Sequence, residues 1–250
     1  MQENRLKKRL LNQQTCYGVI SPTNDPIVCE YIGLAGMDFY VIDGEHGFLN
    51  PSDVQHMVRA LEGVECTPLA RVGDLNEKLL LQYLDCGVMG IMMPGCSTAE
   101  DVRRLVAAIK YPPLGQRGLG PVRAAAYMTR MPQAEYVRFA NEQTLVLPQI
   151  EDPEAVENLD KMLEVEGVDG FIVGPRDLAL AMGFLDGPAH PEVQAVIEAA
   201  FKKIRAAGKI AGTVAATAEQ AQKLAQNGVH FVLNSVQGLL SAGVRAFLTK

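Results

Sequence analysis

Four groups of polar residues in this 250-residue chain each follow or end a short apolar run. These groups are Asp43-Gly44-Glu45-His46, Arg71 near the end of 68–72, Gln149-Ile150-Glu151-Asp152, and Gly174-Pro175-Arg176-Asp177. If the apolar runs are parallel strands of one barrel, their carboxyl ends share one rim, where reactive side chains gather. Carboxylates with few other protein ligands suit a hard divalent ion that keeps water molecules. Zinc would need more histidine or cysteine, and only His46 stands there.

Such a set of residues could act on a 2-oxo acid. Its carboxylate and ketone oxygens could chelate the ion, which would then stabilise an enolate as a Lewis acid. His46 can move a proton at neutral pH, and Asp43, three residues earlier, could orient it. Arg71 could stabilise charge on the developing oxyanion.

Each residue also has a structural interpretation. An acidic residue after a strand is often the N-cap of the next helix, and this fits Asp152 before Pro153 well. Asp177 could be a cap too, and His46 or Arg71 taken singly would be structural. The occurrence of two carboxylates, a histidine and an arginine at one predicted rim favours a catalytic role for these residues over a purely structural one.

Two other chemistries are disfavoured. A Schiff-base mechanism needs a lysine at the rim, but the lysines stand in predicted helices, in turns, at the chain ends or at the wrong end of strands, as Lys209 does. The segment GQRGLG at 115–120 lacks the GxGxxG spacing and follows Tyr-Pro-Pro rather than a strand, so no nucleotide cofactor is expected.

The elements that must position these residues alternate along the chain. Eight short apolar runs predict strands at 17–21, 39–43, 68–72, 90–94, 145–150, 170–174, 209–214 and 231–235. Most are apolar on both faces, as in parallel strands covered by helices. Amphipathic stretches predict helices at 51–61, 75–85, 98–109, 153–165, 191–207, 218–226 and 237–248, with Asn50 as a cap and Gly87 as a stop. We therefore predict a single-domain (β/α)₈ TIM barrel over 1–250, with a doubly wound open sheet as the alternative.

Composition narrows the function classes. The net charge of −6 argues against nucleic acid as the main partner. No apolar run approaches the ~20 residues of a membrane span, and the N-terminal stretch lacks the apolar core of a secretory signal. The five cysteines are an odd number without a CxxC pair, which predicts reduced, buried thiols in a cytoplasmic protein.

The sequence also resembles a known family. The similarity lies in DFYVIDGEHG (38–47), PLARV (68–72), the segment 90–120, LPQIEDPEAVENLD (147–160) and GVDGFIVGPRDLALAMG (167–183). These segments are similar to the HpcH/HpaI aldolases, the metal-dependent class II pyruvate aldolases that act on 4-hydroxy-2-oxoheptanedioate, 2-keto-3-deoxy sugar acids and related 2-oxo acids. The combination of the three motifs EH, QIE and GPxDL is specific, and the resemblance covers nearly the whole chain.

The resemblance implies a (β/α)₈ barrel that assembles as a homo-hexamer, a trimer of dimers exchanging the last helix. It implies that Glu151 and Asp177 bind Mg²⁺, Mn²⁺ or Co²⁺, and that His46, paired with Asp43, is the acid/base. Further implied roles are contact of Arg71 with the substrate keto oxygen, a place for Gln149 beside the metal, and receipt of the substrate carboxylate by the backbone at Gly174, Pro175 and Arg176. The implied reaction is reversible cleavage of a 4-hydroxy-2-oxo acid to pyruvate and an aldehyde.

Two departures from the family pattern stand out. Ser235-Val236 replaces an aspartate that relatives commonly have after the last strand, and Arg176 stands where small residues are common. Arg176 could add positive charge near the substrate carboxylate or point to solvent. The alternative functions are another metal-enolate enzyme, such as a CoA-thioester lyase or an oxaloacetate decarboxylase, and a catalytically silent barrel.

Overall fold

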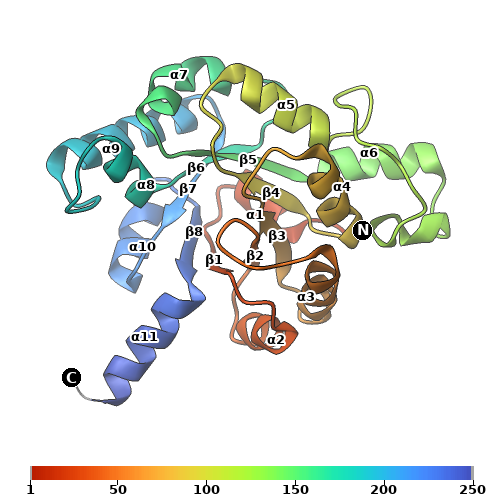
Figure 1. Cartoon of the computed structure of the whole chain (residues 1–250), viewed down its shortest axis with the longest axis horizontal. Coiled ribbons are helices and arrows are strands. Elements are labelled where there is room, and N and C mark those ends of the chain that lie inside the picture. Colours follow the sequence, from red (N-terminus) through yellow and green to blue (C-terminus); the bar gives the residue numbers. More distant parts are fainter. Residues whose placement is uncertain (1, 249–250) are drawn as a thin grey trace.

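Eight parallel strands close into one barrel in the computed structural model, which describes residues 2–248 (Figure 1). They are β1 (Cys16–Ser21), β2 (Phe39–Asp43), β3 (Thr67–Arg71), β4 (Gly90–Met93), β5 (Leu145–Ile150), β6 (Gly170–Val173), β7 (Ile210–Val214) and β8 (Phe231–Ser235). Each strand pairs with the next in sequence, and β8 pairs with β1 to close the barrel. This topology confirms the predicted (β/α)₈ fold.

Helices surround the barrel in the order of the chain (Figure 1). They are α1 (Arg5–Leu11), α2 (Pro26–Leu34), α3 (Pro51–Gly63), α4 (Glu77–Cys86), α5 (Ala99–Ile109), the 3₁₀ segment η1 (Arg123–Met128), α6 (Gln133–Gln143), α7 (Pro153–Leu163), α8 (Pro175–Ala181), α9 (Pro191–Ala206), α10 (Ala218–Gln226) and α11 (Val236–Phe247). None of the helices within residues 2–248 has both the length and the apolar character to cross a bilayer.

The residues that predict helix ends in the sequence lie at helix ends in the structure. Asn50 caps α3 in a capping box with Asp53, and Gly87 ends α4 with a φ of 109°, a conformation that favours glycine. Sequence reasoning did not delimit α1, α2 or α6. In α2 the apolar side chains of Ile27 and Tyr31 point to solvent, so the helix has no polar face that would mark it as amphipathic.

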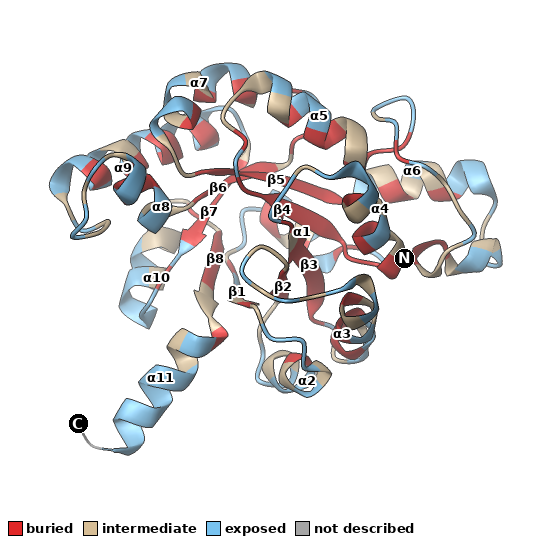
Figure 2. Ribbon diagram, in the orientation of Figure 1, coloured by how far each residue is buried: buried red, intermediate tan, exposed pale blue. Residues whose placement is uncertain are grey.

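The core has two main layers and a small third cluster around Tyr111 and Tyr136. The strands are buried along most of their length (Figure 2). The inner layer fills the barrel and includes Phe39 stacked on Phe231, with 4.2 Å between ring centroids. The outer layer lies between the strands and the helices. Leu6 and Leu10 of α1 belong to the inner layer, so this short helix closes the amino end of the barrel.

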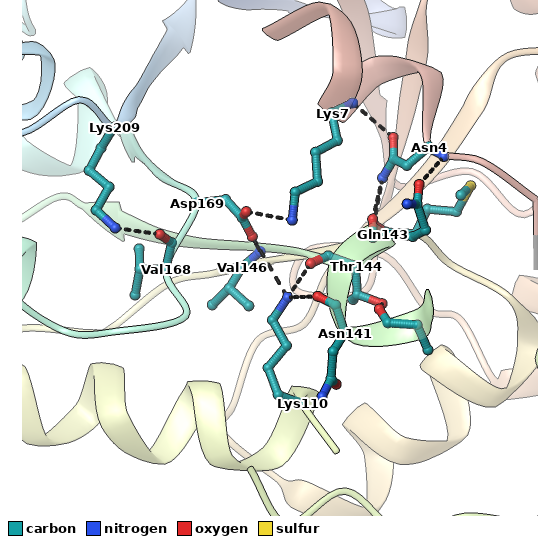
Figure 3. A network of polar contacts seen from close by, with 12 residues as sticks. Asn4, Lys7, Lys110, Asn141, Gln143, Thr144, Val146, Val168, Asp169 and Lys209 are labelled. Carbon is teal, nitrogen blue, oxygen red and sulfur yellow. Dashed lines mark hydrogen bonds and ion pairs between the residues drawn. The ribbon is translucent and has the colours of Figure 1, made fainter. Parts of the chain in front are cut away.

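A polar network holds that amino end together (Figure 3). The Asn4 amide donates to the carbonyls of Met89 and Gln143, and the Lys7 ammonium lies 2.7 Å from the Asp169 carboxylate. The buried Lys110 ammonium donates to the carbonyls of Asn141 and Thr144 at 2.7 and 2.6 Å. Burial lowers the pKa of Lys110 to about 8. This end of the barrel is occupied by structural contacts, which leaves the opposite rim for chemistry.

The cysteines agree with the predicted reduced state. All five thiols are free and buried. Burial raises the pKa of Cys16, Cys29, Cys66 and Cys96 to about 12, so these thiols are poor nucleophiles at neutral pH.

Candidate active site

The carboxyl-end rim carries the residues expected from the sequence. Asp43 is the last residue of β2 and Arg71 the last of β3, and the two are register partners across the strand pair. Gln149 lies in β5, and Glu151 follows that strand directly. The strand order therefore brings together side chains that are up to about a hundred residues apart in sequence.

Arg71 is held by two carboxylates. Its Nε and Nη2 donate to Oδ1 and Oδ2 of Asp43 at 2.9 and 2.7 Å, and its Nη1 lies 3.0 Å from Oε2 of Glu45. This two-pronged contact fixes the plane of the guanidinium. Burial opposes the charge of Arg71, but its hydrogen bond and charge attraction with Asp43 and the charge of Glu45 prevail and raise its pKa. Arg71 is thus a pre-oriented cation at the rim.

Asp43 also shapes the turn that carries His46. Its Oδ1 accepts the backbone N–H groups of Glu45 and His46 at 3.2 and 3.3 Å. Gly47 completes the turn, where a Cβ atom would lie 2.2 Å from the carbonyl oxygen of Asp43. Asp43 therefore contacts the backbone N–H of His46, and the same carboxylate accepts hydrogen bonds from Arg71. The imidazole of His46 is exposed at the rim, and its pairing with Asp43 stays a prediction.

Glu151 lies among polar and charged groups from several elements of the barrel. Its Oε1 accepts the Gly95 N–H at 2.8 Å and its Oε2 accepts the Gln149 amide at 2.8 Å. Burial raises the pKa of Glu151; the Gly95 hydrogen bond and Arg71 lower it, while the negative charges of Glu45 and Asp177 raise it further. Three carboxylates therefore repel one another at this site.

Two features next to Glu151 favour binding of a ligand there, namely an unpartnered hydrogen-bond acceptor and an open face. The Oε1 of Gln149 is buried and has no hydrogen-bond partner among residues 2–248. Gly174 lies close by, where a Cβ would approach within 3.2 Å of the Glu151 Cβ and 3.3 Å of its Oε2. A side chain at position 174 would crowd the carboxylate, so glycine keeps this face of Glu151 open.

The two acidic residues with an alternative capping role separate in the structure. Asp152 caps α7 by accepting the Ala155 N–H at 2.8 Å, as predicted. Asp177 caps nothing: the N-cap of α8 is Gly174, and Asp177 is an exposed residue of the first helical turn. Its carboxylate is available to a ligand.

The residues present fit a hard divalent cation. Glu151 and Asp177 offer two carboxylates whose mutual repulsion a cation would relieve, and Mg²⁺ is often held by one or two carboxylates and water. Among residues 2–248 no group of three or more His, Cys, Asp or Glu side chains is arranged to hold a metal ion.

Other predicted residues lie at the edge of this cluster. Pro175 is the first residue of α8, and Arg176 is exposed beside it. Their contact with a substrate carboxylate stays a prediction. Lys209 donates to the carbonyl of Val168, which precedes β6, so this lysine lies at the opposite end of the barrel as expected (Figure 3).

Sequence reasoning missed two contributors. Glu45 lies between Asp43 and His46, but its sequence position predicts no role for it. In the structure it is the second carboxylate that contacts Arg71. Gly95 supplies a backbone N–H from the loop after β4, where its φ is 64°. The Pro94-Gly95 pair after an apolar run is the signal that could have indicated such a turn.

The fold and the site together define a class of protein. It is the class of (β/α)₈-barrel enzymes that carry paired carboxylates and a fixed arginine at the carboxyl-end rim. Within this class, the model of the HpcH/HpaI aldolase/citrate lyase family matches residues 17–242, and the chain belongs to that family. A 2-keto-3-deoxy-L-rhamnonate aldolase of Salmonella schwarzengrund (strain CVM19633) is 39% identical over 238 residues, which is 95% of this chain and 88% of the relative.

Solved structures agree with this assignment. A HpcH/HpaI aldolase/citrate lyase family protein from Burkholderia cenocepacia J2315 is 29% identical with a TM-score of 0.92, and covers 98% of both chains. The citrate synthase SbnG is also 29% identical, with a TM-score of 0.89 over 98% of this chain and 96% of that one. The family predicted from the sequence is confirmed.

Proposed function

We propose that this chain is a metal-dependent class II aldolase that reversibly cleaves 4-hydroxy-2-oxo acids to pyruvate and an aldehyde. The observation that carries the proposal is the Glu151 carboxylate, which is held by Gly95 and Gln149 within the electrostatic reach of Asp177 and Arg71. Family membership and the 39% identity to a 2-keto-3-deoxy-L-rhamnonate aldolase support the same reaction class. We therefore propose 2-keto-3-deoxy sugar acids as the first substrates to test.

Glu151 and Asp177 would hold the cation, with Mg²⁺, Mn²⁺ and Co²⁺ as the candidate ions. When bound, the cation would supply positive charge opposite the developing enolate. Gln149 positions Glu151, and its unpartnered Oε1 can accept a hydrogen bond from substrate or from a water molecule.

Side chains and backbone groups of the chain itself perform the remaining steps of the reaction. Arg71, fixed by Asp43 and Glu45, donates N–H groups to the keto oxygen, where negative charge grows as the carbon–carbon bond breaks. The imidazole of His46 takes the proton from the 4-hydroxyl group in cleavage and returns it in synthesis. Backbone N–H groups at the start of α8 would receive the substrate carboxylate, because a helix N-terminus favours an anion.

A coupled assay of pyruvate release tests the proposal. Wild-type chain with Mg²⁺ or Mn²⁺ should release pyruvate from 2-keto-3-deoxy-L-rhamnonate without CoA, and exhaustive chelation should abolish this. Glu151→Gln keeps the shape of the side chain and should be inactive at any metal concentration. Inactivation by borohydride in the presence of pyruvate would instead reveal a Schiff-base lysine and contradict the proposal. Turnover of oxaloacetate or a CoA thioester alone would favour one of the alternative metal-enolate functions.

We also propose that the chain forms the homo-hexamer expected of the family, with α11 exchanged between subunits. Helix α11 projects away from the barrel, and Val236 is its one buried residue (Figures 1 and 2). Phe247 is 88% exposed and Leu240 64%, and together with Tyr31 of α2 they line an apolar groove of about 720 Å³. Such a surface on a water-soluble chain marks an interface.

Light scattering on the intact protein tests the assembly. Wild type should have the mass of six chains, and Leu240→Glu/Phe247→Glu should give smaller species. A monomeric wild type would contradict the hexamer.

We also propose a cytoplasmic location, because the described thiols are free and buried, as is usual for proteins of a reducing compartment.

A further inference from the structure

A second charged region lies on the outer wall of the barrel, beside the rim that carries Glu151. It is a cleft of about 940 Å³ between α9 and α10 that reaches the start of α8. Four cationic side chains line it, namely Arg176, Lys202, Arg205 and Lys223, and we call it the basic cleft. Glu198 is the one carboxylate in its lining, although the whole chain carries a net charge of −6.

The cations of the basic cleft come from facing helices. Lys202 and Arg205 stand three residues apart and share a face of α9. Lys223 faces them from α10. Within residues 2–248 neither Lys202 nor Lys223 forms an ion pair, whereas the adjacent Lys203 lies 2.7 Å from Asp160. Like charges that face one another are unfavourable unless an anion comes between them.

Helix α10, one side of the cleft, is exposed to solvent along its length. None of its residues is buried, and Figure 2 shows α10 exposed or half-exposed along its length. Apolar side chains also line the cleft, among them Phe201 of α9 and Leu224 of α10. An occupant therefore meets both positive charge and hydrocarbon, which suits an organic anion better than a bare ion.

We propose that the basic cleft binds a small organic molecule that carries two or more carboxylate or phosphate groups. Its anionic groups contact Lys202, Arg205 and Lys223, and its hydrocarbon part lies over Phe201 and Leu224. Because Arg176, one residue before Asp177, is among the residues that line the cleft, the bound anion lies next to the rim without contacting Glu151. This inference does not depend on the proposed aldolase activity.

Calorimetric titration of the intact, metal-free chain tests the site. Tricarballylate carries carboxylates on a three-carbon chain and 1,3-propanediol bisphosphate carries phosphates on one, so the tighter probe identifies the preferred anionic group. Lys202→Gln/Lys223→Gln removes two cations from opposite walls, and we expect it to weaken binding by about tenfold or more. Lys203→Gln makes the same charge change one residue away, outside the cleft, and should alter affinity by less than about twofold.

Three results would overturn the proposal. Wild type could bind neither probe at concentrations up to about 10 mM. The double variant could keep wild-type affinity, which would place the anion elsewhere. Lys203→Gln could weaken binding as much as the double variant, which would indicate diffuse surface charge rather than a site. Thermal unfolding of each variant verifies that the exposed substitutions leave the fold intact.

Discussion

Replacing Arg71 by lysine separates a catalytic role from a structural one. The guanidinium makes three polar contacts, at 2.9 and 2.7 Å to Asp43 and 3.0 Å to Glu45. A lysine ammonium keeps the charge but lacks the planar fork, so it can retain about one of these contacts. Losing two hydrogen bonds at about 1 kcal/mol each gives a loss of about 2 kcal/mol in the free energy of unfolding. For a chain of this length that is a decrease of roughly 4–8 °C in Tm.

The effect on catalysis should be larger than this change in stability implies. The keto oxygen gains charge on the way to the enolate, so its contact with Arg71 strengthens in the transition state. Loss of one such donor costs about 10²–10³ in rate. We therefore expect Arg71→Lys to bind metal normally, to remain folded at 25 °C, and to lose about 10²-fold in kcat/KM.

Steady-state kinetics and thermal unfolding of two variants make the comparison. Arg9→Lys is the matched control, because Arg9 pairs with Asp38 immediately before β2, at the opposite end of the strand that ends in Asp43. It should lower Tm modestly and leave kcat/KM unchanged. If Arg71→Lys lowers Tm but turns over at the wild-type rate, the arginine is structural and the reasoning is wrong.

Three further predictions follow from the same structure. His46→Ala should lose ~10²–10⁴-fold in turnover while Mn²⁺ affinity is kept; a variant that loses Mn²⁺ would make His46 a ligand. Because the pKa of Glu151 is raised, protons should compete with Mn²⁺ at a higher pH than for an ordinary glutamate; paramagnetic resonance titrations that show pH-independent affinity would contradict this. Burial lowers the pKa of Lys110 from 10.5 to about 8, so the unfolded chain binds more protons between these values. The unfolding free energy of wild type should therefore rise with pH across that window relative to Lys110→Met, and parallel pH profiles would refute it.

The fold could be predicted because its signals are local. Continuous apolar runs indicated all eight strands, with ends that differ from the structure by one residue at most. The cap at Asn50 and the stop at Gly87 depend on neighbouring backbone groups, so the sequence alone contains the information. Helix α2 lacked such a signal because its outward side chains, such as Ile27 and Tyr31, are apolar.

The position of the candidate residues at one rim was predictable, but their contacts with one another were not. Strand ends indicated Asp43, Arg71 and Glu151, because parallel strands place their carboxyl ends on one rim. The pairing of Asp43 with Arg71 depends on the register between β2 and β3, and these strands are buried on both faces, so they lack the alternating pattern that would reveal it. The same holds for the Gly95 N–H on Glu151, since a backbone donor has no side-chain signature.

Exchange of the pyruvate methyl protons with solvent deuterium tests the central claim most directly. Enolate formation requires removal of a methyl proton, and this step needs no aldehyde, so the unknown acceptor does not enter the measurement. Mass spectrometry should show deuterium incorporation into pyruvate with wild-type chain and Mg²⁺. We predict no incorporation after exhaustive chelation or with Glu151→Gln. Incorporation that persists at the wild-type rate in both cases would contradict a cation held by Glu151 and an enolate formed at this rim.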